Sequence, residues 1–598
     1  MASTLPHWDM SVVFPGLDSP EYAAAYAANV KAVDELAALF DAQGIAKLET
    51  VLHIEQTVAA FELAASALNR TLEGIITQRA YVAAFVTTDS RNALAQKLMS
   101  ALEQQLVRLS VLSTRFTAWI GSVDVEQLIE RSGMARDHAF MLRKAKAKAA
   151  HLMSPAEEEL AARLDLTGGT AWTKLHGNYS SQIMAPIELD GETRELPMTA
   201  IRNLAYGSRR EVRRRAYEAE LAAWKRAEVP ILAALNGVKG ETNTLTERRR
   251  WADPLEEALF ESHIDQATLD AMMGAAREAF PDFRRYLKAK ARILGVEALA
   301  WFDLFAPVGE SSREWPYEEA GKFIVKQFAT YSPKLSGLAK RAFDERWIDA
   351  EPREGKRGGA FCMWLRKDES RILANYAPVF GEVSTLAHEL GHAYHNLAES
   401  KRTILQRDTP MTLAETASIF CQTIVQEAVL KEADAQEQLL ILESSLQDSC
   451  QVVVDITSRF LFERGVFARR KQSELSAQEL NELMLDAQRQ TYGDGLDPRY
   501  LHPYMWAVKP HYYGSSFYNY PYMFGLLFGL GLYAQYRMDP EGFKAGYDEL
   551  LASTGMGQAA ELAARFGIDT RSAAFWKASL DVIRKDIDRF ESLAGGLA

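Results

Sequence analysis

One stretch of the sequence, residues 384–395, reads STLAHELGHAYH. Apolar side chains recur in and around it at the spacing of a helix buried along one side, at Val383, Leu386, Ala387, Leu390 and Ala393. His388 and His392 are four residues apart, so both imidazoles lie on one face of that helix and can bind one metal ion. Glu389 follows the first histidine, where its carboxylate can face a metal-bound water. This H-E-x-x-H pattern is typical of zinc hydrolases.

The sequence outside this stretch is predominantly helical. Apolar residues recur three and four apart in segments rich in Ala, Leu, Glu, Gln and Lys, at 20–43, 47–67, 73–110 and 125–151. Two segments instead predict β-hairpins. Residues 181–198 contain the turn Asp190-Gly191 between two partly alternating runs, and residues 359–366 and 371–377 flank a turn at 367–370.

These patterns predict the fold class. We expect a mainly α protein with a few short β-hairpins, and a soft domain boundary near residues 190–205. Residues 1–200 would form an N-terminal helical lobe, and residues 201–598 a larger catalytic domain that contains the metal helix, residues 384–398.

Composition excludes several classes of protein. The chain has 598 residues, of which 48% are hydrophobic and 25% charged, as in globular proteins. Its net charge of -12 argues against nucleic acid or an anionic membrane as the main partner. Residues 512–536 carry no charge, but the strongly apolar part runs only from 523 to 534, which favours a buried helix over a membrane span.

The cysteines and the first residues indicate the compartment. Cys362, Cys421 and Cys450 form no C-x-x-C pair, so a disulfide framework is not expected and a reducing compartment fits. Met1–Met10 has neither the basic region nor the apolar region of a secretory signal. We therefore expect a cytoplasmic location.

A catalytic zinc needs three protein ligands and one open position. A metzincin would need Gly at 395 and His at 398, where the chain has His395 and Ala398, so that class is excluded. His395 lies three residues after His392 and could approach the metal, but we expect it to support a ligand or to be structural. Glu399 lies about two turns beyond His392, too far along the helix axis to share the ion. Glu415 follows 23 residues after His392 in an apolar helical setting. A buried glutamate needs a partner or a cation, so we expect Glu415 to be the third ligand.

A second cluster of polar aromatic residues lies at 506–522, WAVKPHYYGSSFYNYPY. It contains His511 and five tyrosines. A tetrahedral intermediate needs hydrogen-bond donors at its developing oxyanion, which imidazole and phenol groups can supply. Aromatic core packing is an equal alternative from composition alone.

At this point the chain resembles a known family, the oligoendopeptidase F branch of the thimet-oligopeptidase-like zinc metallopeptidases. The matching pieces are spread over nearly the whole chain: Trp8-Asp9 with 14–16, residues 355–361, the metal helix at 385–392, residues 414–418, and Trp506, 510–512 and 517–522. The metal helix is the most specific of these matches, and the N-terminal match is weak.

The resemblance implies two helical lobes around a deep channel that holds one zinc ion per chain. It implies hydrolysis of internal bonds in short peptides, since a narrow channel excludes folded proteins. Matching positions would make His388, His392 and Glu415 the zinc ligands and Glu389 the general base. His511 and Tyr520 would stabilise the oxyanion, with Tyr518 or Tyr522 as alternates that also contact substrate.

Two departures from the family pattern matter. Seven residues after the ligand Glu415, relatives often carry a second glutamate, whereas this chain has Gln422, which would weaken the negative charge behind the ligands and could lower metal affinity. The spacing from His511 to the tyrosines is also about one residue longer than in close relatives.

The second hairpin suggests how a peptide could be held. Its strand after Gly359 and Ala360 could pair with the peptide backbone as an added strand and leave the side chains loosely specified. Two alternatives to an endopeptidase remain, a catalytically silent peptide-binding protein and a zinc exopeptidase. An intact Glu389 argues against the silent protein, because a binding protein needs no base. The sequence says nothing of oligomeric state.

Overall fold

The computed structural model describes residues 5–48, 53–309 and 313–596. The chain divides into two compact units, each built from three separate segments. The first unit comprises residues 1–152, 314–429 and 539–562, and the second comprises 153–313, 430–538 and 563–598. Each unit thus takes segments from both sides of residue 200, and the predicted division into a lobe and a catalytic domain at that residue stays a prediction.

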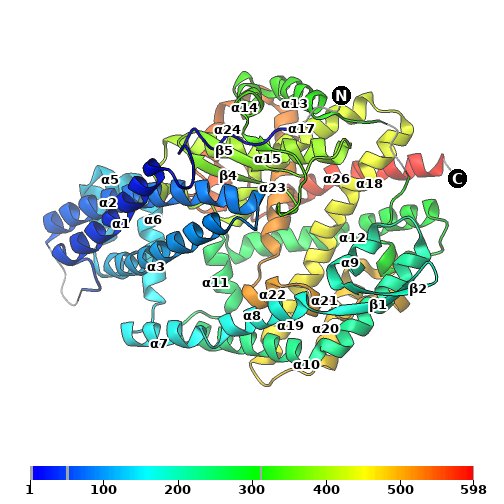
Figure 1. Ribbon diagram of the computed structural model, residues 1–598, viewed down its shortest axis with the longest axis horizontal. Helices are drawn as coiled ribbons and strands as arrows, with labels where there is room; N and C mark the ends of the chain where they lie inside the picture. Colours follow the sequence, from blue (N-terminus) through cyan, green and yellow to red (C-terminus); the bar gives the residue numbers. More distant parts are fainter. Residues whose placement is uncertain (1–4, 49–52, 310–312, 597–598) are drawn as a thin grey trace. The chain divides into compact units, whose positions relative to one another are not determined.

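Helices make up most of both units, so the predicted mainly α fold class is confirmed (Figure 1). Those wholly or mostly in the first unit are α1 (Pro20–Ala42), α2 (Ile54–Thr88), α3 (Ala93–Ser122), α4 (Val125–Arg131), α5 (Gly133–Asp137), α6 (Ala139–Ala150), α13 (Tyr317–Tyr331), α14 (Pro333–Asp344), α15 (Phe380–Ala398), α16 (Met411–Ala414), α17 (Thr416–Glu432), α24 (Pro540–Leu551) and α25 (Ala559–Ala564).

The second unit is built in the same way. Its helices are α7 (Pro155–Asp165), α8 (Gly169–Ser181), α9 (Met198–Asn203), α10 (Arg210–Arg248), α11 (Pro254–Glu261), α12 (Gln266–Ile293), α18 (Ala435–Cys450), α19 (Ile456–Arg470), α20 (Ala477–Tyr492), α21 (Met505–Val508), α22 (His511–Gly514), α23 (Tyr520–Met538) and α26 (Ala573–Gly595). A π-helical turn, η5 (Gln451–Asp455), joins α18 to α19.

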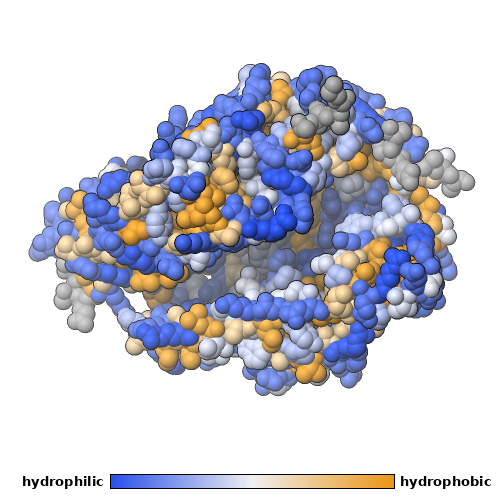
Figure 2. All heavy atoms as spheres, viewed as in Figure 1, coloured by the Kyte–Doolittle hydropathy of each residue, from blue (hydrophilic) through white to orange (hydrophobic). Residues whose placement is uncertain are grey.

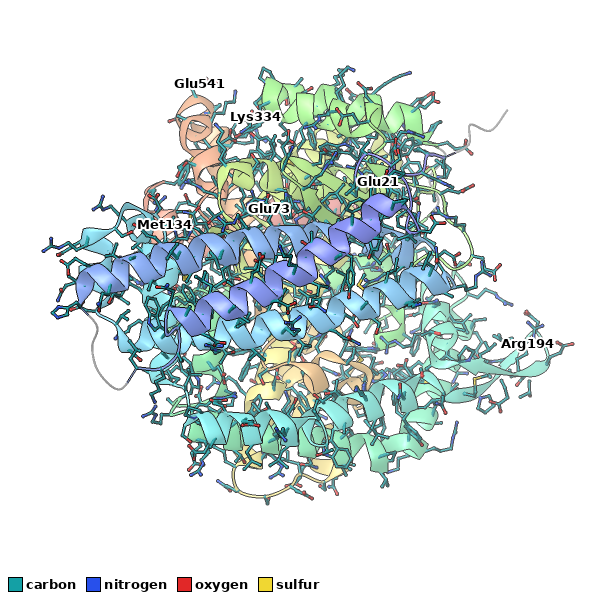
Figure 3. All side chains as sticks on the ribbon, turned by 60° about the vertical axis from the view of Figure 1, so that its left-hand side comes forward. Glu21, Glu73, Met134, Arg194, Lys334 and Glu541 are labelled. Atoms are coloured by element: carbon teal, nitrogen blue, oxygen red, sulfur yellow. The ribbon has the colours of Figure 1, made fainter. Side chains whose placement is uncertain are left out.

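Three long helices, α1 to α3, lie side by side in the first unit (Figure 3). Their core includes Phe40, Phe61 and Trp119, one from each helix. The predicted gap between helices 47–67 and 73–110 is wrong, because α2 runs unbroken to Thr88. Buried Leu68 keeps the apolar period through the expected gap. Residues 49–52 of the predicted helix lie outside the described residues.

The break falls instead at residues 89–92, inside the predicted helix 73–110. The side chain of Asn92 accepts a hydrogen bond from the backbone N–H of Ala95 at 3.0 Å and caps the start of α3. Asparagine is among the residues that most favour this position, because its side chain satisfies an N–H that the helix leaves unpaired.

Both predicted hairpins are confirmed. β1 (Met184–Leu189) pairs antiparallel with β2 (Glu192–Pro197) across Asp190 and Gly191, whose φ values of 53° and 84° fit a type I′ turn. β4 (Phe361–Arg366) pairs antiparallel with β5 (Glu369–Leu373) in a sheet of order β3-β5-β4. The parallel strand β3 (Ile348–Asp349) was not predicted, since two residues carry no alternation to detect.

Helix α23 is buried along most of its length, as predicted for the uncharged segment. Within the described residues, no helix is long and apolar enough to cross a membrane. On the face that Figure 2 shows, hydrophilic and hydrophobic side chains are intermixed.

Candidate metal centre

Three side chains of the first unit meet at one point, as the sequence predicted. Nε2 of His388 lies 3.2 Å and Nε2 of His392 lies 3.4 Å from Oε2 of Glu415. Both histidines project from α15, and Glu415 stands between α16 and α17. One ligand atom from each lies within 4.8 Å of the others. The three side chains are partly exposed, so they can be reached from solvent.

Gly391 explains how Glu415 reaches the histidines. A Cβ atom on this residue would lie 2.6 Å from both the carbonyl oxygen of Ala417 and Cα of Ser418. The backbones of α15 and α17 therefore pack directly against each other, and only glycine allows this approach. The position is not one of the predicted site residues, although it lies within the histidine motif.

Two neighbouring side chains hold the ligands in place. Oε1 of Gln422 lies 2.9 Å from Nδ1 of His388, and Oγ of Ser418 donates to Oε2 of Glu415 at 2.5 Å. An acceptor at Nδ1 fixes the proton there and leaves the lone pair of Nε2 for a metal. Gln422 thus occupies the supporting position that the sequence comparison with the family suggested.

The charges of this cluster are strongly coupled. Burial by itself would raise the pKa of Glu415, but hydrogen bonds and charges from His388 and His392 outweigh it and hold that pKa far below its usual range. Burial would lower the pKa of His388, but the hydrogen bond and charge of Glu415 raise it to about 9. Two imidazoles and one carboxylate at this separation can share a cation, either a proton or a metal ion.

Glu389 is buried beside the cluster, with 6% of its surface exposed. Burial raises the pKa of its carboxyl, while the charges of the two histidines and the backbone N–H of Cys362 on β4 act in the opposite direction. Among the described residues, Oε2 of Glu389 has no hydrogen-bond partner. A buried oxygen without a partner is available to a ligand that enters the site.

His395 and Glu399 bind to other segments of the first unit rather than to the metal cluster. Nε2 of buried His395 lies 2.9 Å from Oγ1 of Thr554, and Oγ1 of Thr409 donates to Glu399 at 2.7 Å. These contacts link α15 to neighbouring segments of the first unit, and neither residue joins the metal cluster.

The predicted histidine and tyrosine cluster belongs to the second unit. The ring of His511 stacks on that of Tyr518 with centroids 4.4 Å apart, and the hydroxyls of Tyr518 and Tyr522 lie 2.9 Å apart. Tyr520 is separate from this group. It is 1% exposed, and its hydroxyl donates to the carbonyl of Ala258 at 3.1 Å and lies 2.9 Å from Ser262 Oγ.

The structure therefore brings His511 together with the two alternates rather than with Tyr520. Burial, and the charges of Arg459 and Lys509, lower the pKa of His511 and favour its neutral form.

Gly359 and Ala360 precede β4, at the edge of the three-stranded sheet. Gly359 is exposed with a φ of 79°, a conformation that favours glycine, and its carbonyl accepts from Nδ2 of Asn375 at 2.9 Å. β5 occupies one side of β4, and no described strand occupies the other.

The residues of the centre fit a divalent metal ion. Two imidazoles and one carboxylate are a donor set that suits zinc. Gln422 and Ser418 orient two of the three donors, and the unpartnered oxygen of Glu389 lies beside them. No other group of three such side chains is found within the described ranges.

The fold and this centre are those of a metallopeptidase. A family model described as Peptidase family M3 matches residues 203–582, and another described as Oligopeptidase F matches residues 120–183. The chain belongs to peptidase family M3, a family of metallopeptidases, so the resemblance predicted from the sequence is confirmed. The larger match falls inside the predicted catalytic domain, 201–598.

Relatives with curated names agree with this family. An oligoendopeptidase F homolog of Lactococcus lactis is 24% identical over 81% of this chain and 80% of its own length. Group B oligopeptidase PepB of Streptococcus agalactiae is 26% identical over 76% of each chain. Oligoendopeptidase-F of Enterococcus faecium, a solved structure, superposes with a TM-score of 0.70 at 18% identity and covers 96% of this chain and 99% of its own. That structural likeness supports the fold.

Proposed function

We propose that the chain is a zinc-dependent endopeptidase that hydrolyses internal bonds of short peptides. The observation that carries this proposal is the convergence of His388, His392 and Glu415 beside a buried Glu389 with an unpartnered oxygen. A protein that only bound peptides would need neither the metal ligands nor a buried base.

His388, His392 and Glu415 would hold one zinc ion per chain. When bound, zinc polarises a substrate carbonyl and lowers the pKa of a water molecule to about 7. Glu389 accepts the proton of the attacking water and passes it to the leaving amine. Its buried position beside the ligands and its unpartnered oxygen place the carboxylate where it can take part in both halves of this transfer.

We assign stabilisation of the oxyanion to His511 and to a tyrosine hydroxyl. Tyr518 and Tyr522 are better candidates than Tyr520, because they are partly exposed and lie with His511, whereas the buried hydroxyl of Tyr520 already has two hydrogen-bond partners in the protein. A neutral His511 still carries one ring N–H, which can donate a hydrogen bond to the oxyanion.

We propose that the substrate backbone pairs with the open side of β4. Pairing through main-chain hydrogen bonds would tolerate many peptide sequences, with Gly359 and Ala360 at the start of the paired segment. We also propose the deep channel that the family resemblance implies. A narrow channel would admit short peptides and exclude folded proteins.

We also propose a cytoplasmic location. Cys362, Cys421 and Cys450 are all free thiols, which suits a reducing compartment.

The test uses an internally quenched peptide of about ten residues, blocked at both ends. Wild type at saturating zinc should cleave it, while chelator-treated protein and Glu389→Gln should lose about 100-fold or more of the activity. Glu382→Gln, on the same helix two turns earlier, is the matched control and should keep it. Metal content per chain is measured for every sample.

The same assay distinguishes an endopeptidase from an exopeptidase and from a catalytically silent peptide-binding protein. Zinc at one per chain with no cleavage of the blocked peptide, but cleavage of the same peptide with free ends, would indicate an exopeptidase. Binding without any cleavage would indicate the silent protein. Cleavage that survives both the chelator and Glu389→Gln would refute the proposed site.

A further inference from the structure

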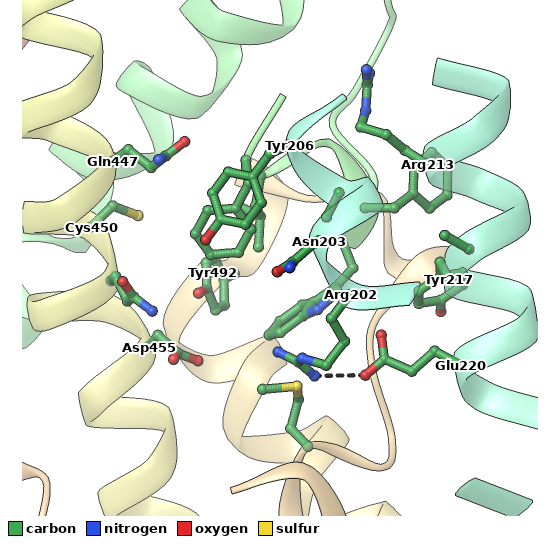
Figure 4. Close-up of a pocket in the computed structure, with 18 of the residues that line it drawn as sticks. Arg202, Asn203, Tyr206, Arg213, Tyr217, Glu220, Gln447, Cys450, Asp455 and Tyr492 are labelled. Carbon is green, nitrogen blue, oxygen red and sulfur yellow. Dashed lines mark hydrogen bonds and ion pairs between the residues drawn. The ribbon is translucent and has the colours of Figure 1, made fainter. Parts of the chain in front are cut away.

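A pocket of ≈ 230 Å³ lies wholly within the second unit and contains none of the metal-site residues. Figure 4 shows it between Gln447 and Asp455 on one side and Tyr217 and Glu220 on the other, with Arg202 and Asn203 between them. Its volume is below the roughly 300–1,000 Å³ of pockets for drug-sized ligands. A ligand of one or two amino-acid residues is therefore the right size.

Arg202, Arg213 and Lys509 line the pocket, and Arg213 pairs with Asp303 at 3.0 Å. Arg202 pairs with Glu220 at 2.6 Å, and Arg459 pairs with Asp455. Lys509 lies beside these pairs, and its side-chain nitrogen has no hydrogen bond or ion pair within the described part of the chain. An uncompensated ammonium in a partly buried pocket is costly, and an anionic ligand would relieve that cost.

Burial lowers the pKa of Lys509 to about 7, and the charge of Arg459 adds to this lowering. Asp455 and Glu220 act in the opposite direction, and Arg202 adds to the lowering. Lys509 is thus poised to take up a proton when a negative charge enters the pocket.

The rest of the lining indicates an organic ligand. Tyr206, Trp301, Phe305 and Tyr492 supply aromatic surface. Gln451 and Asp455 come from the π-helical turn η5, and such turns are frequent at functional sites because they distort the regular helix surface. One unpaired cation suits a monoanion, and aromatic walls suit a carbon skeleton, which together favour a carboxylate over phosphate.

We propose that this pocket binds a small organic carboxylate, with its anionic group at Lys509 and Arg202 and its apolar part against the aromatic walls. Two sources share this chemistry, the C-terminal carboxylate of a short peptide and a free amino-acid derivative. The binding does not depend on hydrolysis, so it can be tested even if the peptidase assay fails.

Calorimetry with the full-length protein compares N-acetyl-L-phenylalanine with its carboxamide. Loss of a charged hydrogen bond should weaken the carboxamide by about 10- to 100-fold. Lys509→Met should weaken the acid to the same extent, whereas Lys225→Met, an exposed lysine on α10 of the same unit, should leave it unchanged. Because the charged form of Lys509 binds, wild-type affinity should fall as pH rises from 7 to 9.

Hydrogen exchange of wild type provides a readout that does not rely on a variant that folds poorly. The acid should protect the backbone amides of residues 447–455 and 505–509. Equal affinity for acid and carboxamide, acetate bound as tightly as the aromatic acid, unchanged affinity in Lys509→Met, or protection confined to α15 would each overturn the proposal.

Kinetics distinguish the two sources. If the peptide terminus is the ligand, amidating the C-terminus of a quenched peptide should raise KM in wild type and leave it unchanged in Lys509→Met. If a free amino-acid derivative is the ligand, amidation should not alter KM while the calorimetric preference for the acid persists. Both KM results support the carboxylate site, provided that calorimetry shows tighter binding of the acid than of the carboxamide.

Discussion

Replacing Gly391 with alanine should damage the metal centre although no ligand is touched. The added Cβ would lie 2.6 Å from Ala417 O and Ser418 Cα, and ordinary contact begins at 3.4 Å. These backbone atoms cannot rotate away, so α15 and α17 must separate by about 0.8 Å to make room. A metal ligand tolerates a displacement of only about 0.2 Å.

Two effects with opposite signs set the change in stability. Overpacking costs about 1–3 kcal/mol, and alanine gains up to about 1 kcal/mol over glycine in helix propensity. We expect a net loss of about 1–2 kcal/mol. Displacing a carboxylate that Ser418 holds should weaken zinc binding by about 10- to 100-fold, since loss of ligand support has that effect elsewhere.

Competition with a chromophoric chelator measures zinc affinity, and urea denaturation of the metal-free protein measures stability. Gly337→Ala is the matched control, because a Cβ there has nothing within 4 Å on helix α14 of the same unit. It should bind zinc normally and gain up to about 1 kcal/mol. Wild-type zinc affinity in Gly391→Ala would show that α17 adjusts freely, and would refute the reasoning.

Three further predictions concern polar side chains. Gln422→Glu adds a negative charge behind His388 and should tighten zinc by about 10- to 100-fold in the same competition assay; unchanged affinity would contradict it. Tyr518→Phe should lower kcat by about 100-fold or more, whereas Tyr520→Phe should mainly cost about 1–3 kcal/mol in urea denaturation; the reverse pattern would return the oxyanion role to Tyr520. Burial opposes ionisation of Glu220, but His502 and Arg202 hold its pKa at about 2. The stability it contributes is complete above its unfolded pKa of 4.5 and is lost as pH falls towards 2. The advantage of wild type over Glu220→Gln should therefore shrink between pH 5 and pH 3.

The histidine pair of the centre could be predicted because its geometry is local. A spacing of four residues on an apolar-faced helix places His388 and His392 together whatever the rest of the chain does. Glu415 required a second argument, that a carboxylate in an apolar setting needs a cation, and the structure places it 3.2–3.4 Å from both rings. Both hairpins were predictable for the same local reason.

What could not be predicted depends on contacts between distant segments. The need for glycine at 391 follows only from the backbone of α17. The interleaving of three segments in each unit leaves no periodic trace, since hydrophobic periodicity reports which face of a helix is buried but not what covers it. Helix α2 runs unbroken through residues 68–72, where the sequence predicted a gap between two helices. Tertiary packing of a helix face stabilises a helix beyond its local propensity, so the gap could not be judged from the sequence.

Because the side chain at 422 is neutral, Glu389 should affect metal affinity as well as catalysis. Two neutral imidazoles and one carboxylate compensate half of the charge of a divalent cation, and Gln422 accepts a hydrogen bond from His388 without adding charge. Glu389 is the remaining buried carboxyl group beside the ligands. A cation in the centre would lower the pKa of Glu389 by its charge, against the burial that raises it. Base strength and metal affinity are therefore coupled through this residue, so extra charge from Gln422→Glu should reach catalysis as well as binding.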